Sequence, residues 1–113
     1  MSFRVRYTRG ARDDLKRLYA FLLEYDTALA ARALEAIRRA TELLANFPFT
    51  CRKVDEANPF LRELVISFGS SGYVALFEIE GAQRDVGPAP SGGEGNLYVT
   101  ILAIRHQRED DYH

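Results

Sequence analysis

The chain has 113 residues, of which 47% are hydrophobic and 27% charged, and this composition is typical of one globular domain spanning residues 1–113. Its longest unbroken apolar run, residues 18–23, is far shorter than the roughly 18 residues that cross a membrane, so we expect no membrane span. The net charge is −1, but residues 1–54 carry an excess of positive charge and residues 55–113 an excess of negative charge. This asymmetry suggests a basic surface that meets an acidic partner.

The cysteine content and the N-terminus predict where the protein works. Cys51 has no second cysteine to pair with, which points to a reducing compartment. Residues 1–7 carry charges where a secretory signal peptide would be apolar. We therefore expect a cytoplasmic protein.

The first half of the chain is predicted to form one strand and two helices. Residues 3–7 alternate apolar and basic side chains, which is the period of a strand with one buried face. Thr8 can cap a helix with an apolar stripe, and Asp26 can cap a second one that ends before Pro48. The result is an αα-hairpin with a short corner.

The second half is predicted to form strands and loops. Residues 49–59 are polar and bounded by prolines, which predicts a loop. Residues 60–68 and 73–79 flank a Gly-Ser-Ser-Gly turn and predict an antiparallel hairpin, and residues 97–104 predict the last strand. Residues 81–95 contain five glycines and two prolines, which predicts a mobile loop.

The order β-α-α-β-β-β predicts an α+β fold. We expect an antiparallel sheet of about four strands, covered on one face by the N-terminal αα-hairpin. The first strand should lie at an edge of this sheet or inside it. The leucines of both helices are expected to belong to the core, because each helix needs one buried side to be stable.

No metal and no cofactor is expected. The sequence contains no glycine-rich nucleotide loop, no HExxH and no CxxC pair. Cys51, His106 and His113 are scattered along the chain, so neither a zinc site nor a Cys-His nucleophile has a local signature. We interpret them as a half-buried thiol and two surface histidines.

One group of side chains combines cations with proton-transfer groups: Arg62, Arg105, His106, Arg108 and Tyr112. RNA cleavage through a 2′-hydroxyl needs a base, an acid and cations that stabilise the phosphorane. His106 or Tyr112 could transfer protons, and the arginines could hold phosphate. Strand periodicity sends Arg105 and His106 to opposite faces, so only one of them can share a face with Arg62.

A simpler interpretation of these charges remains open. Arg62 could pair with a helix carboxylate such as Asp14, and the C-terminal charges could serve only to keep the last strand soluble. A second basic group lies near the N-terminus: Arg4, Arg6, Arg9 and Arg12. It could contact phosphates or an acidic protein segment, or it could form only a solvated face.

Three segments of the second half carry a family resemblance: LRELVI at 61–66, GYVALF at 72–77 and ILAIRHQRE at 101–109. The start of the chain adds Tyr7-Thr8 followed by an Ala-Asp-Leu pattern at positions 11, 14 and 15. With these motifs the chain resembles the RelE/ParE superfamily of type II toxin–antitoxin toxins, on its ParE-like branch. The resemblance covers nearly the whole chain except residues 81–95.

The resemblance implies a small cytoplasmic toxin that is held inactive by a cognate antitoxin, whose C-terminal segment wraps around it. ParE-like members act on DNA gyrase by binding, so we expect a toxin that is not an enzyme. Contacts with the target are expected from Arg105, His106, Gln107, Arg108 and Tyr112. Contacts with the antitoxin, or a general basic surface, are expected from Arg4, Arg6, Arg9 and Arg12.

Two alternatives follow from the same resemblance. RelE-like members cut messenger RNA on the ribosome, and a metal-independent endoribonuclease of this kind would use Arg62, His106, Arg108 and Tyr112. Gln107 stands where the nuclease branch usually has an arginine, and Arg52-Lys53 match its loop lysines only loosely, so gyrase binding is favoured. The further alternative is a non-toxic interaction module of the same fold.

Overall fold

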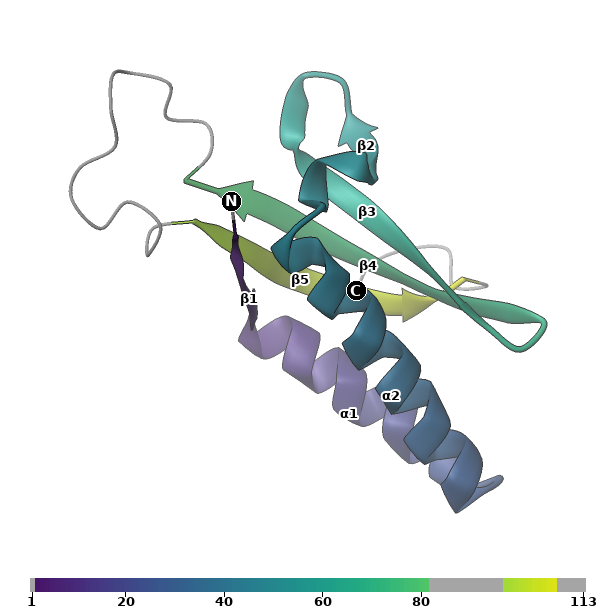
Figure 1. Ribbon diagram of the computed structural model, residues 1–113. Coiled ribbons are helices and arrows are strands. Elements are labelled where there is room, and N and C mark those ends of the chain that lie inside the picture. Colours follow the sequence, from purple (N-terminus) through teal and green to yellow (C-terminus); the bar gives the residue numbers. More distant parts are fainter. Residues whose placement is uncertain (1, 82–96, 108–113) are drawn as a thin grey trace.

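The computed structural model describes residues 2–81 and 97–107 and contains two helices and five strands in those ranges (Figure 1). In chain order the elements are β1 (Arg4–Tyr7), α1 (Arg9–Leu23), α2 (Thr27–Glu42), η1 (Leu43–Ala45), η2 (Pro48–Thr50), β2 (Arg52–Asp55), β3 (Asn58–Phe68), β4 (Ser71–Glu80) and β5 (Tyr98–His106). The strands form one sheet in the order β1-β5-β4-β3-β2. The predicted α+β fold, with a helical hairpin on one face of the sheet, is confirmed.

The sheet has one strand more than the sequence indicates. Residues 49–59, expected to be a loop, contain the last two residues of the 3₁₀ turn η2 and all of strand β2, which pairs antiparallel with β3. All four residues of β2 are exposed, so no alternation of apolar and polar side chains marks this segment as a strand. The segment 81–95, expected to be mobile, lies outside the described residues apart from Gly81.

Strand β1 occupies an edge of the sheet and runs parallel to β5, whereas all other neighbouring strands are antiparallel. It pairs residue by residue with the first half of β5, as far as Ile101. Thr8 then continues the contact: its N–H donates to the Ile101 carbonyl at 3.0 Å, and its hydroxyl lies 3.2 Å from the Leu102 carbonyl. The second half of β5 extends beyond the end of β1.

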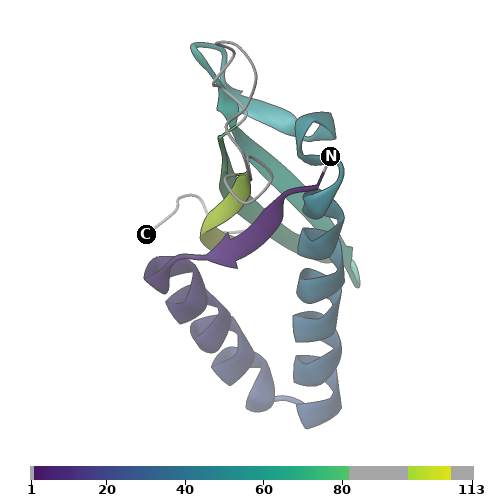
Figure 2. The same cartoon turned by 60° about the vertical axis from the view of Figure 1, so that its left-hand side comes forward.

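Both helices begin at the predicted caps. The Thr8 hydroxyl accepts the Ala11 N–H at 3.1 Å, and the Asp26 carboxylate accepts the Ala28 and Leu29 N–H groups at 2.8 and 3.3 Å. The two helices meet at their short corner and spread apart toward the sheet (Figure 2). Within the described ranges, neither helix has the length and apolar character needed to cross a membrane.

The core lies between the helical hairpin and the side of the sheet that faces it. Phe77, Ile79 and Ile101 are fully buried there, because alternation along β4 and β5 sends their side chains to the helix side. Ala11 and Ala33 are also buried, and their small side chains allow the helices to lie close to this layer.

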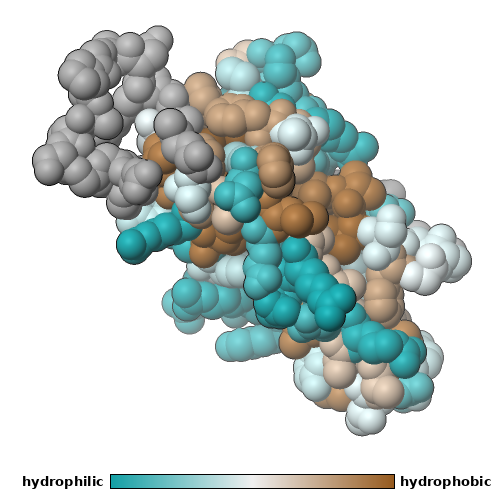
Figure 3. Space-filling model, viewed as in Figure 1, coloured by the Kyte–Doolittle hydropathy of each residue, from teal (hydrophilic) through white to brown (hydrophobic). Residues whose placement is uncertain are grey.

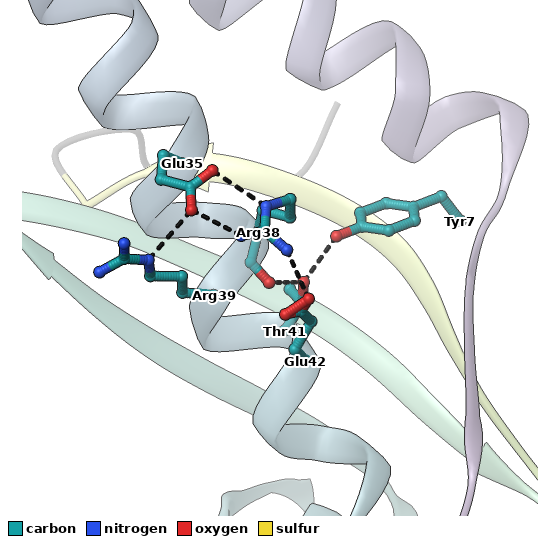
Figure 4. A network of polar contacts seen from close by, with 6 residues as sticks. All are labelled: Tyr7, Glu35, Arg38, Arg39, Thr41 and Glu42. Atoms are coloured by element: carbon teal, nitrogen blue, oxygen red, sulfur yellow. Dashed lines mark hydrogen bonds and ion pairs between the residues drawn. The ribbon is translucent and has the colours of Figure 1, made fainter.

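The outer side of α2 is polar. Figure 3 shows hydrophilic residues along this helix and hydrophobic residues where it meets the sheet. Glu35 forms ion pairs with Arg38 at 2.5 Å and with Arg39 at 3.0 Å, and Arg38 also pairs with Glu42 (Figure 4). The hydrogen bonds from Arg38 and then Arg39 lower the pKa of Glu35 to about 2. On the inner side of α2, Thr41 is buried and contacts β1.

Candidate functional site

The end of β5 carries two of the predicted target-binding residues to opposite faces of the sheet. In the β4–β5 register, Arg105 lies opposite Val74 and His106 lies opposite Tyr73. Tyr73 belongs to the core on the helix side, so His106 faces the helices and Arg105 faces away. The His106 ring packs edge-on against Tyr73 with 5.5 Å between ring centroids, and its Nε2 lies 3.0 Å from Ser71 Oγ.

His106 contributes to a groove between α1 and the turn that joins β3 to β4, with a volume of about 640 Å³. We call it the α1 groove and define it by its lining residues: Arg17, Leu18, Phe21, Leu22, Phe68, Gly69, Ser70, Ser71, Gly72, Tyr73 and His106. Its walls are mostly apolar, with a few polar groups, which is the usual make-up of a binding cavity. Tyr73 forms part of one wall, and burial there raises the pKa of its phenol.

The rim of the α1 groove is aromatic. Phe21 is 58% exposed and packs edge-on against Tyr25, which is 71% exposed, with 5.3 Å between ring centroids. Adjacent aromatic side chains that remain in water form an apolar patch, and a partner that covers such a patch removes apolar area from water, which is favourable. The rim therefore offers apolar surface that a partner can cover.

A second, more open hollow lies on the other side of the β3–β4 hairpin. Its volume is about 470 Å³, and it is lined by Ala31, Arg32, Glu35, Ala36, Arg39 and Phe68. Phe68 also lines the α1 groove. The tip of this hairpin is thus flanked by one hollow against α1 and another against α2.

Asp14 connects α1 to the end of β5. The residue is 4% exposed, and its carboxylate accepts the Ile104 backbone N–H at 2.8 Å. Arg17, almost one turn further along α1, lies 3.9 Å from the other carboxylate oxygen and also lines the α1 groove. One buried side chain therefore links the last strand to the wall of the groove.

The structure gives Arg62 partners other than the helix carboxylate considered from the sequence. Its Nε donates to the Pro59 carbonyl at 2.7 Å, and its Nη1 donates to the carbonyls of Phe49 and Cys51 at 2.9 and 2.7 Å. The guanidinium carbon also lies 5.3 Å from the centroid of the Phe49 ring. Arg62 thereby holds η2 and the start of β2 against β3.

Arg62 and His106 share the helix side of the sheet but occupy distant positions on it. Arg62 lies opposite Phe77 and His106 opposite Tyr73, on the two sides of β4. Four residues of strand separate these positions, which corresponds to roughly 13 Å. Arg108 and Tyr112, the other members of the predicted nuclease group, lie outside the described residues.

The N-terminal basic group is divided between β1, with Arg4 and Arg6, and the first turn of α1, with Arg9 and Arg12. Arg6 is engaged within the sheet: it donates to Thr100 and to Glu80 at 2.9 Å each, and its guanidinium lies 3.9 Å from the Tyr98 ring centroid. The Thr100 hydroxyl, and then Arg6, hold the pKa of Glu80 below its usual value. All four arginines are exposed, Arg6 included.

Within residues 2–81 and 97–107, no group of three or more His, Cys, Asp or Glu side chains could hold a metal ion. Cys51 is half-buried, and this burial raises the pKa of its thiol. A protonated thiol is a poor nucleophile and a poor metal ligand. Cys51 lies beside η2, whereas His106 lies on the α1 groove.

Sequence reasoning missed the α1 groove. Leu18 and Leu22 belong to the apolar stripe of α1 and are expected to be core, and the turn residues carry no recognisable motif. Phe21 is the signal that could have revealed it. It lies beside the stripe and not on it, so a helix buried on one side leaves this aromatic ring exposed.

Comparison with known proteins shows similarity to a family model, to a toxin of known sequence and to a solved structure. Residues 5–111 match a family model described as the ParE toxin of the type II toxin–antitoxin system parDE. Toxin RelE1 of Caulobacter vibrioides is 34% identical over 86 residues, which cover 76% of this chain and 89% of that toxin. A chain from the structure of the chromosomal ParDE toxin–antitoxin system of P. aeruginosa is similar in fold, with a TM-score of 0.66 and 18% identity over 93% of this chain and 96% of that chain.

Proposed function

This chain belongs to the ParE toxin family of type II toxin–antitoxin systems, and we propose that it inhibits DNA gyrase by binding to it, without cleaving a bond. Membership of the family makes the chain a toxin component with an antitoxin as its partner. We place both the inhibition and its neutralisation by the antitoxin in the cytoplasm.

The hydrogen bonds of Arg62 are the observation that favours binding over RNA cleavage. RNA cleavage needs cations that face the scissile phosphate, and Arg62 is the arginine considered for this role. Here Arg62 donates three hydrogen bonds to main-chain carbonyls, so those donors already serve the fold. Its position on the far side of β4 from His106 also separates the cation from the imidazole. Both features favour an inhibitor that binds.

We assign contact with gyrase to the C-terminal end of the chain: Arg105, His106, Gln107, Arg108 and Tyr112. The Gln107 N–H donates to the Gly72 carbonyl at 2.9 Å, so hydrogen bonding to β4 continues one residue beyond β5. A strand that is paired to its end holds its last side chains in defined directions. The paired end of β5 therefore holds Arg105 on one face of the sheet and His106 on the other.

We assign the antitoxin to the α1 groove. Apolar walls with an aromatic rim suit the apolar face of an amphipathic helix, and Arg17 offers a cation to an acidic residue of that helix. His106 lies in the same groove, so an antitoxin segment bound there would cover part of the surface assigned to gyrase. The exposed Arg4, Arg9 and Arg12 extend the basic surface available to an acidic antitoxin segment.

Ribosome-dependent RNA cleavage is the second candidate, favoured by two observations. A relative that is 34% identical is named Toxin RelE1. In addition, Lys53 lies opposite Arg62 in the β2–β3 register and Arg52 precedes it, so three cations are gathered at this end of the sheet.

The test titrates the purified protein into gyrase-catalysed supercoiling and, separately, into ribosomes translating a defined messenger RNA. We expect supercoiling to be inhibited and the RNA to stay intact. Truncation after Ile104 should abolish inhibition and leave most of the antitoxin affinity, because Arg17, Leu18 and Phe21 remain in place. Site-specific RNA cuts that disappear in Arg62→Ala would overturn the proposal in favour of the second candidate. Normal growth at high expression would favour the non-toxic interaction module.

A further inference from the structure

We propose that Asp14 is a positioning residue, whose buried carboxylate holds the end of β5 against α1 and so fixes the direction of the side chains that contact the target. This inference rests on the proposed function for the role of Arg105 and His106. The positioning itself rests only on the contacts of Asp14, and it is tested separately below.

A carboxylate at this position needs a reason. Among residues 2–81 and 97–107, Asp14 is the acidic side chain that is buried, with 4% of its surface exposed. It shares a face of α1 with Ala11 and Leu18, which are also buried, so an apolar side chain would fit the periodicity of the helix. Burying a charged group is costly unless its hydrogen bonds are satisfied. The hydrogen bonds that its oxygens accept therefore explain why a carboxylate, and not an apolar side chain, is buried here.

The Asp14 carboxylate binds β5 beyond the point where β1 ends. Strand β1 pairs with β5 only as far as Ile101. Thr8 contacts the carbonyls of Ile101 and Leu102, and Asp14 then receives the Ile104 N–H at 2.8 Å. The start of α1 thus replaces a strand along this stretch of the edge, with side chains in place of backbone groups.

The same stretch of β5 is irregular. Leu76 lies opposite Ala103 and Phe77 lies opposite Ile101, so Leu102 is an extra residue on β5. A bulge of this kind bends a strand and increases its twist, and it often re-aims the side chains that follow. Asp14 binds the backbone of β5 at Ile104, two residues after the bulge. This hydrogen bond fixes the backbone where the bend ends, and so fixes the direction of the strand beyond it.

Two features of the site depend on the hydrogen bond between Asp14 and Ile104. Arg105 and His106 follow Ile104 directly, so the position of the Ile104 backbone sets where their side chains point. Arg17 lies 3.9 Å from Asp14 and lines the α1 groove together with His106. Release of Ile104 would thus let the end of β5 move away from α1 and change the spacing of the two polar groups in the groove.

The chain offers matched variants for a test. Asp14→Ala removes the acceptor, whereas Asp14→Asn keeps one carbonyl oxygen that can receive the Ile104 N–H, loses the charge and has an NH2 group in place of the second oxygen. Asp13→Ala removes the same charge from the exposed neighbouring position. Ile79→Val weakens the core at a fully buried residue of β4 and reports the effect of lower stability alone.

Two readouts separate positioning from stability. Amide exchange measured by NMR should show Ile104 exchanging about tenfold faster in Asp14→Ala, while Val99 and Ile101 in the same strand stay protected. The concentration needed for half-inhibition of gyrase should rise by about tenfold, which corresponds to about 1.4 kcal/mol. Asp14→Asn should restore most of both properties, and Asp13→Ala should match the wild type.

Several results would overturn the role of Asp14. The first is that Asp14→Ala inhibits gyrase as well as the wild type does. The second is that Asp14→Asn fails to restore the inhibition lost in Asp14→Ala. The third is that Ile79→Val, at the same Tm as Asp14→Ala, loses as much inhibition. Unchanged Ile104 exchange would overturn it as well. A wild-type protein that leaves gyrase active overturns the proposed target instead. The exchange data then still decide whether Asp14 positions β5.

Discussion

The Tyr7 hydroxyl on β1 lies 2.6 Å from the Thr41 hydroxyl on α2 (Figure 4). Thr41 donates its own proton to the Arg38 carbonyl at 3.0 Å, so Tyr7 is the donor in the contact between the two hydroxyls. Strand β1 is a four-residue edge strand, and this bond ties its last residue to the second helix.

Removing the Tyr7 hydroxyl should therefore destabilise the protein moderately. Tyr7→Phe keeps the ring and loses one part-buried hydrogen bond, so we expect the free energy of unfolding to fall by about 1 kcal/mol. The Tm should drop by roughly 4–6 °C in a thermal melt followed by circular dichroism. Tyr25→Phe is the control, because the Tyr25 ring is 71% exposed and its variant should melt as the wild type does. Equal Tm values for all three proteins would contradict this prediction.

Arg62 should prove structural. Arg62→Met keeps an unbranched apolar stem and loses three donations to main-chain carbonyls, so we expect a loss of about 1.5–3 kcal/mol in stability. Arg62→Lys should restore little, because an ammonium cannot reproduce the geometry of a guanidinium that reaches three carbonyls. Faster amide exchange confined to η2 and β2 would support this role. Unchanged exchange there in Arg62→Met would count against it.

Two glycines of the β3–β4 turn should respond differently to a methyl group. A Cβ on Gly72 would lie 1.9 Å from the Ile66 carbonyl oxygen, so Gly72→Ala must displace backbone and should cost about 3 kcal/mol or more. Gly69 has a φ of +63° with nothing within 4 Å of an added Cβ, so Gly69→Ala pays only the left-handed backbone cost of about 1–2 kcal/mol. Urea unfolding of both variants checks the order. A Gly69→Ala protein that is the less stable of the two would refute it.

Stability should decline in acid partly through Glu80. The pKa of Glu80 is lowered in the folded state, so the unfolded chain takes up this proton first as the pH falls. The contribution of Glu80 is therefore complete above its ordinary pKa of 4.5 and is lost as the pH falls through the folded value. Urea midpoints measured between pH 6 and pH 3 should fall less steeply in Glu80→Gln than in the wild type. Thr100→Val, which removes the largest cause of the lowered pKa, should give an intermediate slope, and a wild-type slope in both variants would contradict this assignment.

The aromatic rim of the α1 groove should matter for the antitoxin and little for folding. Phe21 is 58% exposed, so Phe21→Asp should leave the Tm nearly unchanged. Placing a charge in an apolar contact should weaken antitoxin binding by about 2 kcal/mol or more, which is about 30-fold in Kd. Isothermal titration calorimetry with the cognate antitoxin measures this change in Kd. Leu43→Asp is the matched control, because Leu43 is 61% exposed and lies outside the groove. Similar losses in both variants would remove the groove as the antitoxin site.

Local signals predicted the elements whose formation depends on neighbours in the chain. Thr8 and Asp26 mark the starts of both helices, because an N-cap acts on N–H groups two or three residues away. The Gly-Ser-Ser-Gly turn marks the hairpin of β3 and β4 for the same reason. The last strand, expected at residues 97–104, is found as Tyr98–His106.

The candidate site was predictable only in part. Periodicity alone placed Arg105 and His106 on opposite faces, and the register confirms this alternation. It could not say which of the two faces the helices, because that depends on the bulge at Leu102 and on the strands that flank β5. The α1 groove was not predicted, since its walls come from α1, the β3–β4 turn and the end of β5.

The sequence by itself determined the helical hairpin, the β3–β4 hairpin, the last strand and, through its motifs, the toxin family. Tertiary structure alone decided that β1 lies parallel to β5, that β2 joins the sheet, and that Asp14 is buried. The physical reason is the distance in sequence between hydrogen-bonding partners. Asp14 and Ile104 are 90 positions apart, and no local pattern reveals that one will supply the acceptor for the other until the strands have found their neighbours.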